Sequence, residues 1–289
     1  MNDKYLSDKW VQQILSLQHD DGSWGCFHTL SNPTKKQPIT TEQALRRLRI
    51  LGLTKDDEPI RRAICYMEDH LKKPYATVFH EKKHDSKTYG DLMLAAWLRL
   101  FDAENKIAFI VAEKWAYIIE RAFEGGIYSH DEYVSAYESV IGIKLNPKAG
   151  CLADFVTFYQ IALLPGLLKS NTESKMLDYV LNHEDGINYI YQFPIKTPPD
   201  TFMSRQTSRY LAALELLSLY HSAAERLMFA VKWIMSNRET DCKWDMGAQV
   251  KDGIYFPLSD SWRKAEDRKR DCTYRIEQLL EKLGEKVNV

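Results

Sequence analysis

The sequence lacks several features that would assign it to a functional class at once. It has no run of 18 apolar residues, and its charged start, MNDKYLSDKW, has no apolar core, so neither a membrane-spanning helix nor a secretory signal is expected. It also has no excess of one charge, since 39 Lys and Arg face 40 Asp and Glu. Without a basic field, nucleic acid and anionic membranes are not expected partners. We therefore expect a soluble, cytoplasmic protein.

The scarcity of cysteine and the absence of period-two alternation are also informative. The five cysteines are an odd number, and none belongs to a C-x-x-C pair. This excludes a disulfide framework and a cysteine-based zinc ribbon, and it agrees with reduced thiols in the cytoplasm. No stretch alternates apolar and polar residues for long, so strands are not expected. The sequence therefore predicts an all-α protein.

What the sequence does contain is a repeat. A segment with apolar residues at helical spacing, such as Tyr5 to Leu17, leads each time into a polar loop that ends in an aromatic residue. These aromatics follow one another at intervals of 51, 53, 61 and 55 residues. The five closing aromatics are Trp24, Tyr75, Tyr128, Tyr189 and Trp244.

A second helical segment follows each loop, so each repeat is predicted to be a helical hairpin. Five hairpins are clear, and an irregular sixth contains residues 151–168, whose length suits one fully buried helix. Helix starts are indicated by side chains that commonly cap the first turn. The predicted N-caps are Thr40, Asp131, Thr172 and Ser222.

The first loop carries a resemblance to a known family. The segment LQHDDGSWG resembles the QW repeat of the terpenoid cyclase and protein prenyltransferase superfamily through Gln18, Gly22, Ser23 and Trp24. The resemblance implies an α/α toroid of about five to six hairpins, which we expect to form a single domain over residues 1–289. Trp24 is then predicted to be structural, because a buried indole covers apolar surface while its N–H needs a carbonyl partner.

The resemblance also implies an enzyme that acts on a prenyl or other apolar substrate in a central cavity by acid chemistry. The Asp-x-Asp-Asp acid motif of the cyclases is absent, so the acid must come from another residue. His130 beside Asp131 is the leading pair, because a neighbouring carboxylate can set the tautomer and pKa of an imidazole. The further catalytic candidates are Asp91 and Asp85, and the predicted substrate contacts are Tyr89, Trp97, Tyr128, Tyr133, Tyr137 and Arg205.

Two alternatives stay open. A toroid without catalytic residues would bind a peptide or protein. A zinc hydrolase would use His80-Glu81-x-x-His84, which matches the pattern of two metal-binding histidines and a general base on one helix face. Cys272 beside Asp271 resembles part of the prenyltransferase zinc site but lacks its histidine. We predict no metal and no other cofactor.

Elemental analysis of the untagged protein tests the metal prediction. We expect well under one equivalent of zinc and a melting temperature that a chelator leaves unchanged, because a bound ion would stabilise the fold by mass action. Stoichiometric zinc that disappears in His80→Ala or His84→Ala would instead identify a hydrolase. Zinc that disappears in Cys272→Ala would point to a prenyltransferase.

Overall fold

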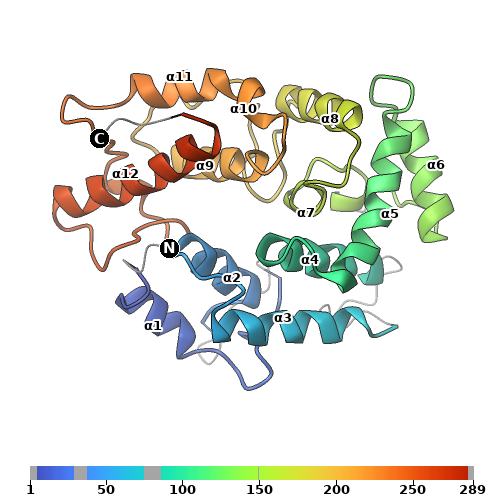
Figure 1. Cartoon of the computed structure of the whole chain (residues 1–289), viewed down its shortest axis with the longest axis horizontal. Helices are drawn as coiled ribbons and strands as arrows, with labels where there is room; N and C mark the ends of the chain where they lie inside the picture. The colour runs from blue at the N-terminus through green and yellow to red at the C-terminus, as the bar shows by residue number, and fades with distance from the viewer. Residues whose placement is uncertain (1–4, 29–37, 75–85, 149, 286–289) are drawn as a thin grey trace. The chain divides into compact units, whose positions relative to one another are not determined.

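The computed structural model describes residues 5–28, 38–74, 86–148 and 150–285 (Figure 1). This part of the chain contains twelve α-helices, two short 3₁₀ helices and no β-strand. The helices are α1 Lys9–Leu15, α2 Thr41–Ile50, α3 Glu58–Leu71, α4 Ser86–Phe101, α5 Lys106–Ala122, α6 His130–Ile141, η1 Gly150–Leu152, α7 Phe158–Leu163, α8 Ser170–Asn182, α9 Arg205–Leu217, α10 Ala223–Arg226, α11 Met228–Ser236, η2 Ala248–Val250 and α12 Ala265–Lys282. The all-α prediction is confirmed, and the toroidal arrangement stays a prediction.

The chain divides into two compact units. Unit 1 comprises Met1–Ala112 and Gly253–Asp260, and unit 2 comprises Glu113–Asp252 and Ser261–Val289. The division falls inside α5. The prediction of one domain over the whole chain concerns cooperative folding and stays a prediction.

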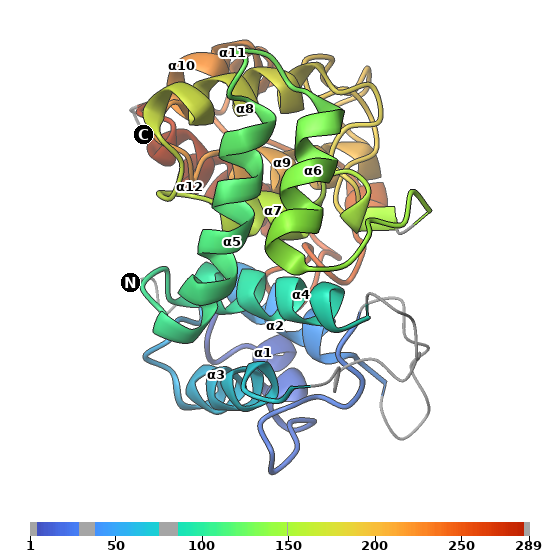
Figure 2. The same cartoon turned by 90° about the vertical axis from the view of Figure 1, so that its right-hand side faces the viewer.

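Unit 1 includes a segment from late in the chain. Its helices pack as α3 on α4 and α1 on α2, and both pairs are neighbours in the two ribbon views (Figure 1, Figure 2). The buried Arg47 of α2 donates hydrogen bonds to the carbonyl oxygens of Ile254, at 3.2 Å, and Pro257. The indole N–H of Trp10 donates to the carbonyl oxygen of Ser259 at 2.8 Å. Residues 253–260 are therefore bound to the first two helices by directed contacts that are partly or fully buried.

Unit 2 is organised around α9, which contacts α7 and α12. The buried Arg275 of α12 donates to both carboxylate oxygens of Glu215, at 2.6 and 3.1 Å, and to Ser208 on the same helix. A buried guanidinium needs such partners, because an unpaired charge in the interior is costly. These contacts fix how α12 lies on α9.

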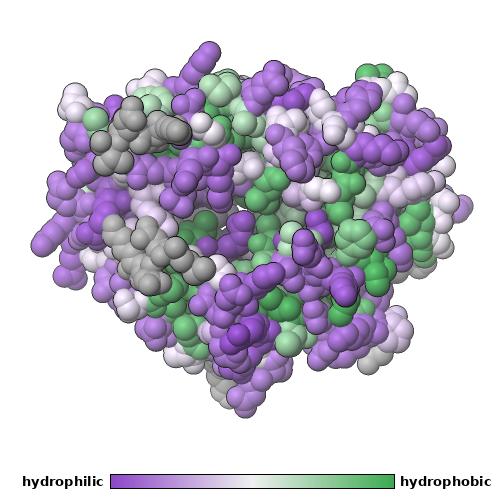
Figure 3. All heavy atoms as spheres, in the orientation of Figure 1, coloured by the Kyte–Doolittle hydropathy of each residue, from purple (hydrophilic) through white to green (hydrophobic). Residues whose placement is uncertain are grey.

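Figure 3 colours one face of the molecule by hydropathy. Hydrophilic side chains cover much of the face drawn in Figure 3, with hydrophobic ones between them. Among the described helices, none joins the length to the apolar character that crossing a bilayer would require.

Glutamates on three helices bind the starts of later helices. Glu68 of α3, Glu120 of α5 and Glu173 of α8 accept hydrogen bonds from groups at the N-termini of α5, α8 and α10, where backbone N–H groups lack partners within the helix. The contacts are Glu68 with the side chain of Asn105 at 2.7 Å, Glu120 with the backbone N–H of Lys169 at 2.7 Å, and Glu173 with the backbone N–H of Ser222 at 3.0 Å. The device recurs along α3, α5 and α8, which agrees with a chain built of repeats.

Four repeat loops share one turn. In each, the N–H of a residue with positive φ donates to the carbonyl oxygen three residues earlier. The turns end at Gly22, Gly126, Gly186 and Cys242, with N to O distances of 3.0, 2.9, 3.1 and 3.0 Å. The residue two places further on is Trp24, Tyr128, Asn188 or Trp244. Asn188, and not the predicted Tyr189, therefore takes the closing position of its repeat, while Tyr75 lies outside the described residues.

The first and last of these loops match in detail. Trp24 is 1% exposed and donates its indole N–H to the carbonyl oxygen of Ile14 at 2.8 Å. Trp244 is 0% exposed and makes the same bond to Ile234 at 2.8 Å, again ten residues earlier. Gln18 donates to the carbonyl oxygen of Pro59 at 2.8 Å in the first turn of α3. The structural role predicted for Trp24 is confirmed.

The predicted helix starts are confirmed in part. Thr40 caps α2 with a capping box, and Ser222 precedes α10 without a side-chain bond. Asp131 and Thr172 lie inside α6 and α8, because Ser129 and Lys169 occupy the N-cap positions. The prediction of one long buried helix at residues 151–168 is wrong: only the six residues of α7 are α-helical there, and all six are buried.

We expect Trp24→Ala and Trp244→Ala each to lower the free energy of unfolding by about 3–5 kcal/mol, because each deletes a fully buried indole. Trp24→Phe keeps most of the ring but leaves the carbonyl oxygen of Ile14 without its donor, so it should cost less than Trp24→Ala and still be measurable. Urea denaturation measures all three. A loss well below 1 kcal/mol for Trp24→Ala would contradict the buried role.

Candidate functional site

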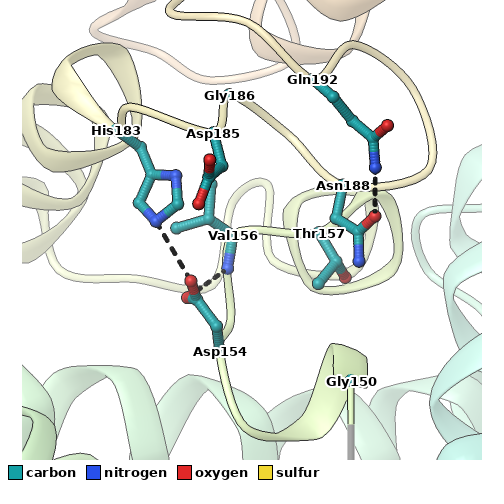
Figure 4. A pocket seen from close by; sticks show the side chains of 9 residues that line it. All are labelled: Gly150, Asp154, Val156, Thr157, His183, Asp185, Gly186, Asn188 and Gln192. Carbon is teal, nitrogen blue, oxygen red and sulfur yellow. Dashed lines mark hydrogen bonds and ion pairs between the residues drawn. The ribbon is translucent and has the colours of Figure 1, made fainter.

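Unit 2 contains a cavity of about 410 Å³. Its wall comes from two segments, one leading into α7 and one following α8 (Figure 4). The lining residues are Gly150, Asp154, Val156, Thr157, His183, Asp185, Gly186, Asn188 and Gln192. The cavity therefore lies at helix ends, where the backbone is irregular and side chains converge.

Backbone hydrogen bonds join the two segments. The N–H of Asn188 donates to the carbonyl oxygen of Val156 at 3.1 Å, and the N–H of Phe158 donates to that of Asn188 at 2.9 Å. Thr157 caps α7 by accepting from the N–H of Tyr159 at 3.3 Å. These contacts explain why α7 starts only at Phe158: the preceding residues are extended and paired with the loop after α8.

Gly186 is required by this arrangement. Its φ is +62°, and a Cβ there would lie 2.3 Å from the carbonyl oxygen of Phe193 and 2.4 Å from that of Tyr191. Only glycine fits so close an approach of backbone to backbone. The turn from His183 to Gly186 thus places the side chains of His183 and Asp185 on one part of the cavity wall (Figure 4).

An ion pair lies on this wall. Nε2 of His183 is 3.1 Å from Oδ2 of Asp154, whose other oxygen accepts from the N–H of Val156 at 3.0 Å. The His183 side chain is 18% exposed and that of Asp154 is 43% exposed. The second ring nitrogen of His183, Nδ1, is buried and makes no hydrogen bond of good geometry within the described residues. The pair is thus open to the cavity through the carboxylate.

Asp154 and His183 each shift the pKa of the other. The hydrogen bond to Asp154 raises the pKa of His183, against burial, which lowers it; the backbone of Gly186 adds a smaller raising effect. Burial by itself raises the pKa of Asp154, but hydrogen bonds from His183 and Val156 outweigh it, and the pKa is lowered. Asp154 is therefore held as a carboxylate, and His183 keeps its proton to higher pH than an ordinary histidine.

An aromatic cluster adjoins the pair. The rings of Tyr128 and Tyr179 lie with centroids 4.5 Å apart, and Tyr179 also packs at 5.8 Å from the ring of His183. Burial and then the charge of Asp154 raise the pKa values of both tyrosines, so both stay neutral. The Tyr128 hydroxyl is 3.1 Å from Nδ1 of His130, whose charge also acts on Asp154.

Three of the predicted site residues thus lie near Asp154. They are His130, Tyr128 and Tyr133, and Tyr133 is buried with its hydroxyl donating to the carbonyl oxygen of Leu152 at 2.8 Å. Tyr137 is buried against Trp115, and Asp131 is exposed in the first turn of α6. Arg205 is exposed on α9 and donates to the carbonyl oxygen of Gln249 at 3.2 Å. None of these residues lines the cavity described above.

The other predicted residues of unit 1 lie together on α4. The Tyr89 hydroxyl is 2.9 Å from Nε2 of His28, and Asp91 pairs with Lys87 one turn earlier. The indole of Trp97 donates to Glu42 at 3.1 Å. His80, His84 and Asp85 lie outside the described residues.

The described residues hold no group of three or more His, Cys, Asp or Glu that could bind a metal ion. Cys272, the remaining candidate ligand, is fully buried, and burial raises its pKa to about 12. Because the thiolate is the form that binds zinc, this environment disfavours a metal there.

The sequence reasoning missed Asp154, His183 and Asp185. Asp154 is the one acid in the apolar run from Cys151 to Leu168, whose length predicts a single buried helix. His183 and Asp185 were interpreted as part of a repeat loop. The available signal was the break in the repeat itself, since Asn188 stands where the other loops carry Trp or Tyr.

We expect Asp154→Asn to lower the pKa of His183 towards its ordinary value near 6.5, because the charged acceptor is lost. A pKa raised in the folded state adds stability below the unfolded pKa, and that stability is lost as pH rises through the folded pKa. The wild-type free energy of unfolding should therefore fall more steeply above about pH 6.5 than that of the variant. NMR titration of the imidazole measures the shift. Glu184→Gln, which removes a carboxylate beside His183 in sequence but off the cavity wall, is the control; an unshifted pKa in Asp154→Asn would contradict the pairing.

Comparison with known proteins adds no relative. No family model, curated protein or solved structure matches the chain. The resemblance to the terpenoid cyclase and prenyltransferase superfamily therefore rests on the first loop and the helical repeat, and any role for the site rests on its own geometry.

Proposed function

We propose that the chain binds a small polar molecule in the cavity of unit 2, with the Asp154 and His183 pair as its ionisable wall. The observation that carries the proposal is the ion pair of 3.1 Å at the edge of a cavity of about 410 Å³. That volume falls in the range of small-molecule sites, and convergent polar groups on a concave wall are what such sites present.

The pair is not needed merely to hold the two segments together. Backbone bonds between residues 156–158 and Asn188 already join them, and Asp154 also accepts from Val156. An ion pair that only joined the two segments would add little to the free energy of unfolding, since partly exposed ion pairs contribute about 0–1 kcal/mol. The half-exposed carboxylate leaves lone pairs directed at the cavity, which a ligand can use.

The cavity lies where the repeat departs from its own pattern. The first and last loops bury Trp24 and Trp244, whereas the loop after α8 places the smaller Asn188 on the cavity wall. The Asn188 amide oxygen accepts from the N–H of Tyr189 at 2.9 Å and from Gln192 at 3.0 Å. A polar side chain thus stands at the position that is aromatic in the other described loops.

The pair also supports proton exchange with the ligand. His183 carries a proton that it keeps to higher pH than an ordinary histidine, because its pKa is raised, while the lowered pKa of Asp154 keeps that group ionised. A histidine side chain exchanges protons readily with oxygen and nitrogen atoms of a ligand. It is too weak an acid to protonate a carbon–carbon double bond with similar ease. Acid–base chemistry on a heteroatom is therefore the reaction type that suits the site.

The apolar substrate implied by the family resemblance is a second candidate. The aromatic cluster of Tyr128, Tyr179 and Phe155 beside Asp154 supports it, since ring faces stabilise cationic groups. The lowered pKa of Asp154 argues for His183 as the proton donor in that case.

NMR titration of the isotope-labelled chain tests this proposal with four polar probes: glycerol, glucose, glucosamine and gluconate. We expect at least one of them to shift the amide signals of Val156, Gly186 and Asn188, with a saturable dependence on concentration. Asn188→Trp, which supplies the aromatic of the other loops, should abolish these shifts by filling the cavity. Gln192→Trp should do the same from the other side.

The matched control is Lys196→Trp, the same substitution at an exposed position off the cavity wall, which should bind as the wild type does. Melting temperatures establish that each variant is folded. If no polar probe shifts the cavity signals while geraniol shifts those of Tyr128 and Tyr179, the second candidate replaces the first.

A further inference from the structure

We infer that the ligand of this cavity carries a protonated amine, which Asp185 and Asp154 bind as a cation. The inference rests on the proposed function and names the chemical class of the ligand. Its starting point is the set of ionisable groups among the described lining residues, which are two carboxylates and one imidazole, with no Lys or Arg.

The only cationic group that the lining residues offer an anion is His183, whose Nε2–H already donates to Asp154. Anion sites in proteins use free backbone N–H groups or unpaired cations. Here the N–H of Val156 donates to Asp154, that of Gly186 to the carbonyl oxygen of His183, and that of Asn188 to the carbonyl oxygen of Val156. The backbone donors of these residues are thus already used, whereas carboxylate oxygens remain.

The Asp185 carboxylate is released by a change in the repeat turn. In the first loop, Asp21 accepts the N–H of Ser23 at 2.9 Å, and in the last, Asp241 accepts the N–H of Lys243 at 3.2 Å. Asp185 holds the same place before the turn residue, but the matching N–H, that of Ile187, donates to the carbonyl oxygen of Tyr191 at 2.8 Å. Within the described part of the chain, Asp185 then makes no side-chain hydrogen bond or ion pair.

The released carboxylate lies on the cavity wall. Figure 4 shows Asp185 beside His183, with Asn188 and Gln192 on the other side of the cavity. The three ionisable groups on the wall are two carboxylates and one imidazole, so carboxylate oxygens predominate there. A ligand ammonium group can donate to Asp185 and to the exposed side of Asp154, and the amide groups opposite can bind a hydroxyl on the same ligand.

The test compares two sugars of the same size that differ in one group, glucosamine and glucose, at a pH where the amine is protonated. NMR titration of the cavity amide signals gives both dissociation constants. We expect glucosamine to bind about two- to fivefold more tightly, the range that one partly exposed ion pair supplies. Asp185→Asn should bring the ratio close to one, and it should fold normally because Asn is well suited to a turn.

Glu184→Gln is the matched control. It removes the same charge from the neighbouring exposed residue, which does not line the cavity, and it should keep the preference for glucosamine. Equal binding of the two sugars by the wild type would overturn the cation inference and leave the polar-ligand site standing. A ratio that Glu184→Gln reduces as much as Asp185→Asn would overturn the assignment to Asp185. Absence of binding by every polar probe would instead overturn the proposed function.

Discussion

The need to provide hydrogen-bond partners for the backbone groups at helix ends shapes most of this structure. A chain of twelve described helices, many of them short, leaves numerous backbone N–H and C=O groups without partners inside the helices. Trp24 and Trp244 each bind a carbonyl oxygen at the end of the preceding helix, and Glu120 and Glu173 each bind the start of a later one. The repeat is thus a repeated solution to one hydrogen-bonding problem.

The candidate site grows from the same constraint. His183 is the residue that ends α8, and Thr157 is the residue that caps α7. The backbone groups at those ends are satisfied by pairing between Val156, Phe158 and Asn188. The polar side chains around them are therefore held in place but are not needed as partners for the helix ends. A rigid backbone with spare polar side chains is the usual basis of a binding site on connecting segments.

The sequence allowed prediction of those features that depend on local pattern. Helical spacing predicted the all-α class, the residue type at Thr40 predicted the cap of α2, and the resemblance to the QW repeat implied the buried Trp24; each depends on neighbours within one hairpin. It could not give the pairing of Asp154 with His183, which are 29 residues apart and meet through a loop contact with no periodic signature. It also placed the closing aromatic at Tyr189, because an aromatic one residue away hid the substitution of Asn188.

The break in the repeat has a thermodynamic side that favours a binding role. A buried indole at this position would add apolar burial worth a few kcal/mol, as it does at Trp24. The chain instead carries Asn188 there, and the next residue, Tyr189, has a φ of +67°, which is uncommon for a residue other than glycine. The chain thus gives up core packing and adopts an unusual backbone conformation at this one loop, while two other loops keep the packed form. The departure occurs where ionisable side chains are open to a cavity. Such local departures concentrate at functional sites, because the rest of the fold supplies the stability that they give up.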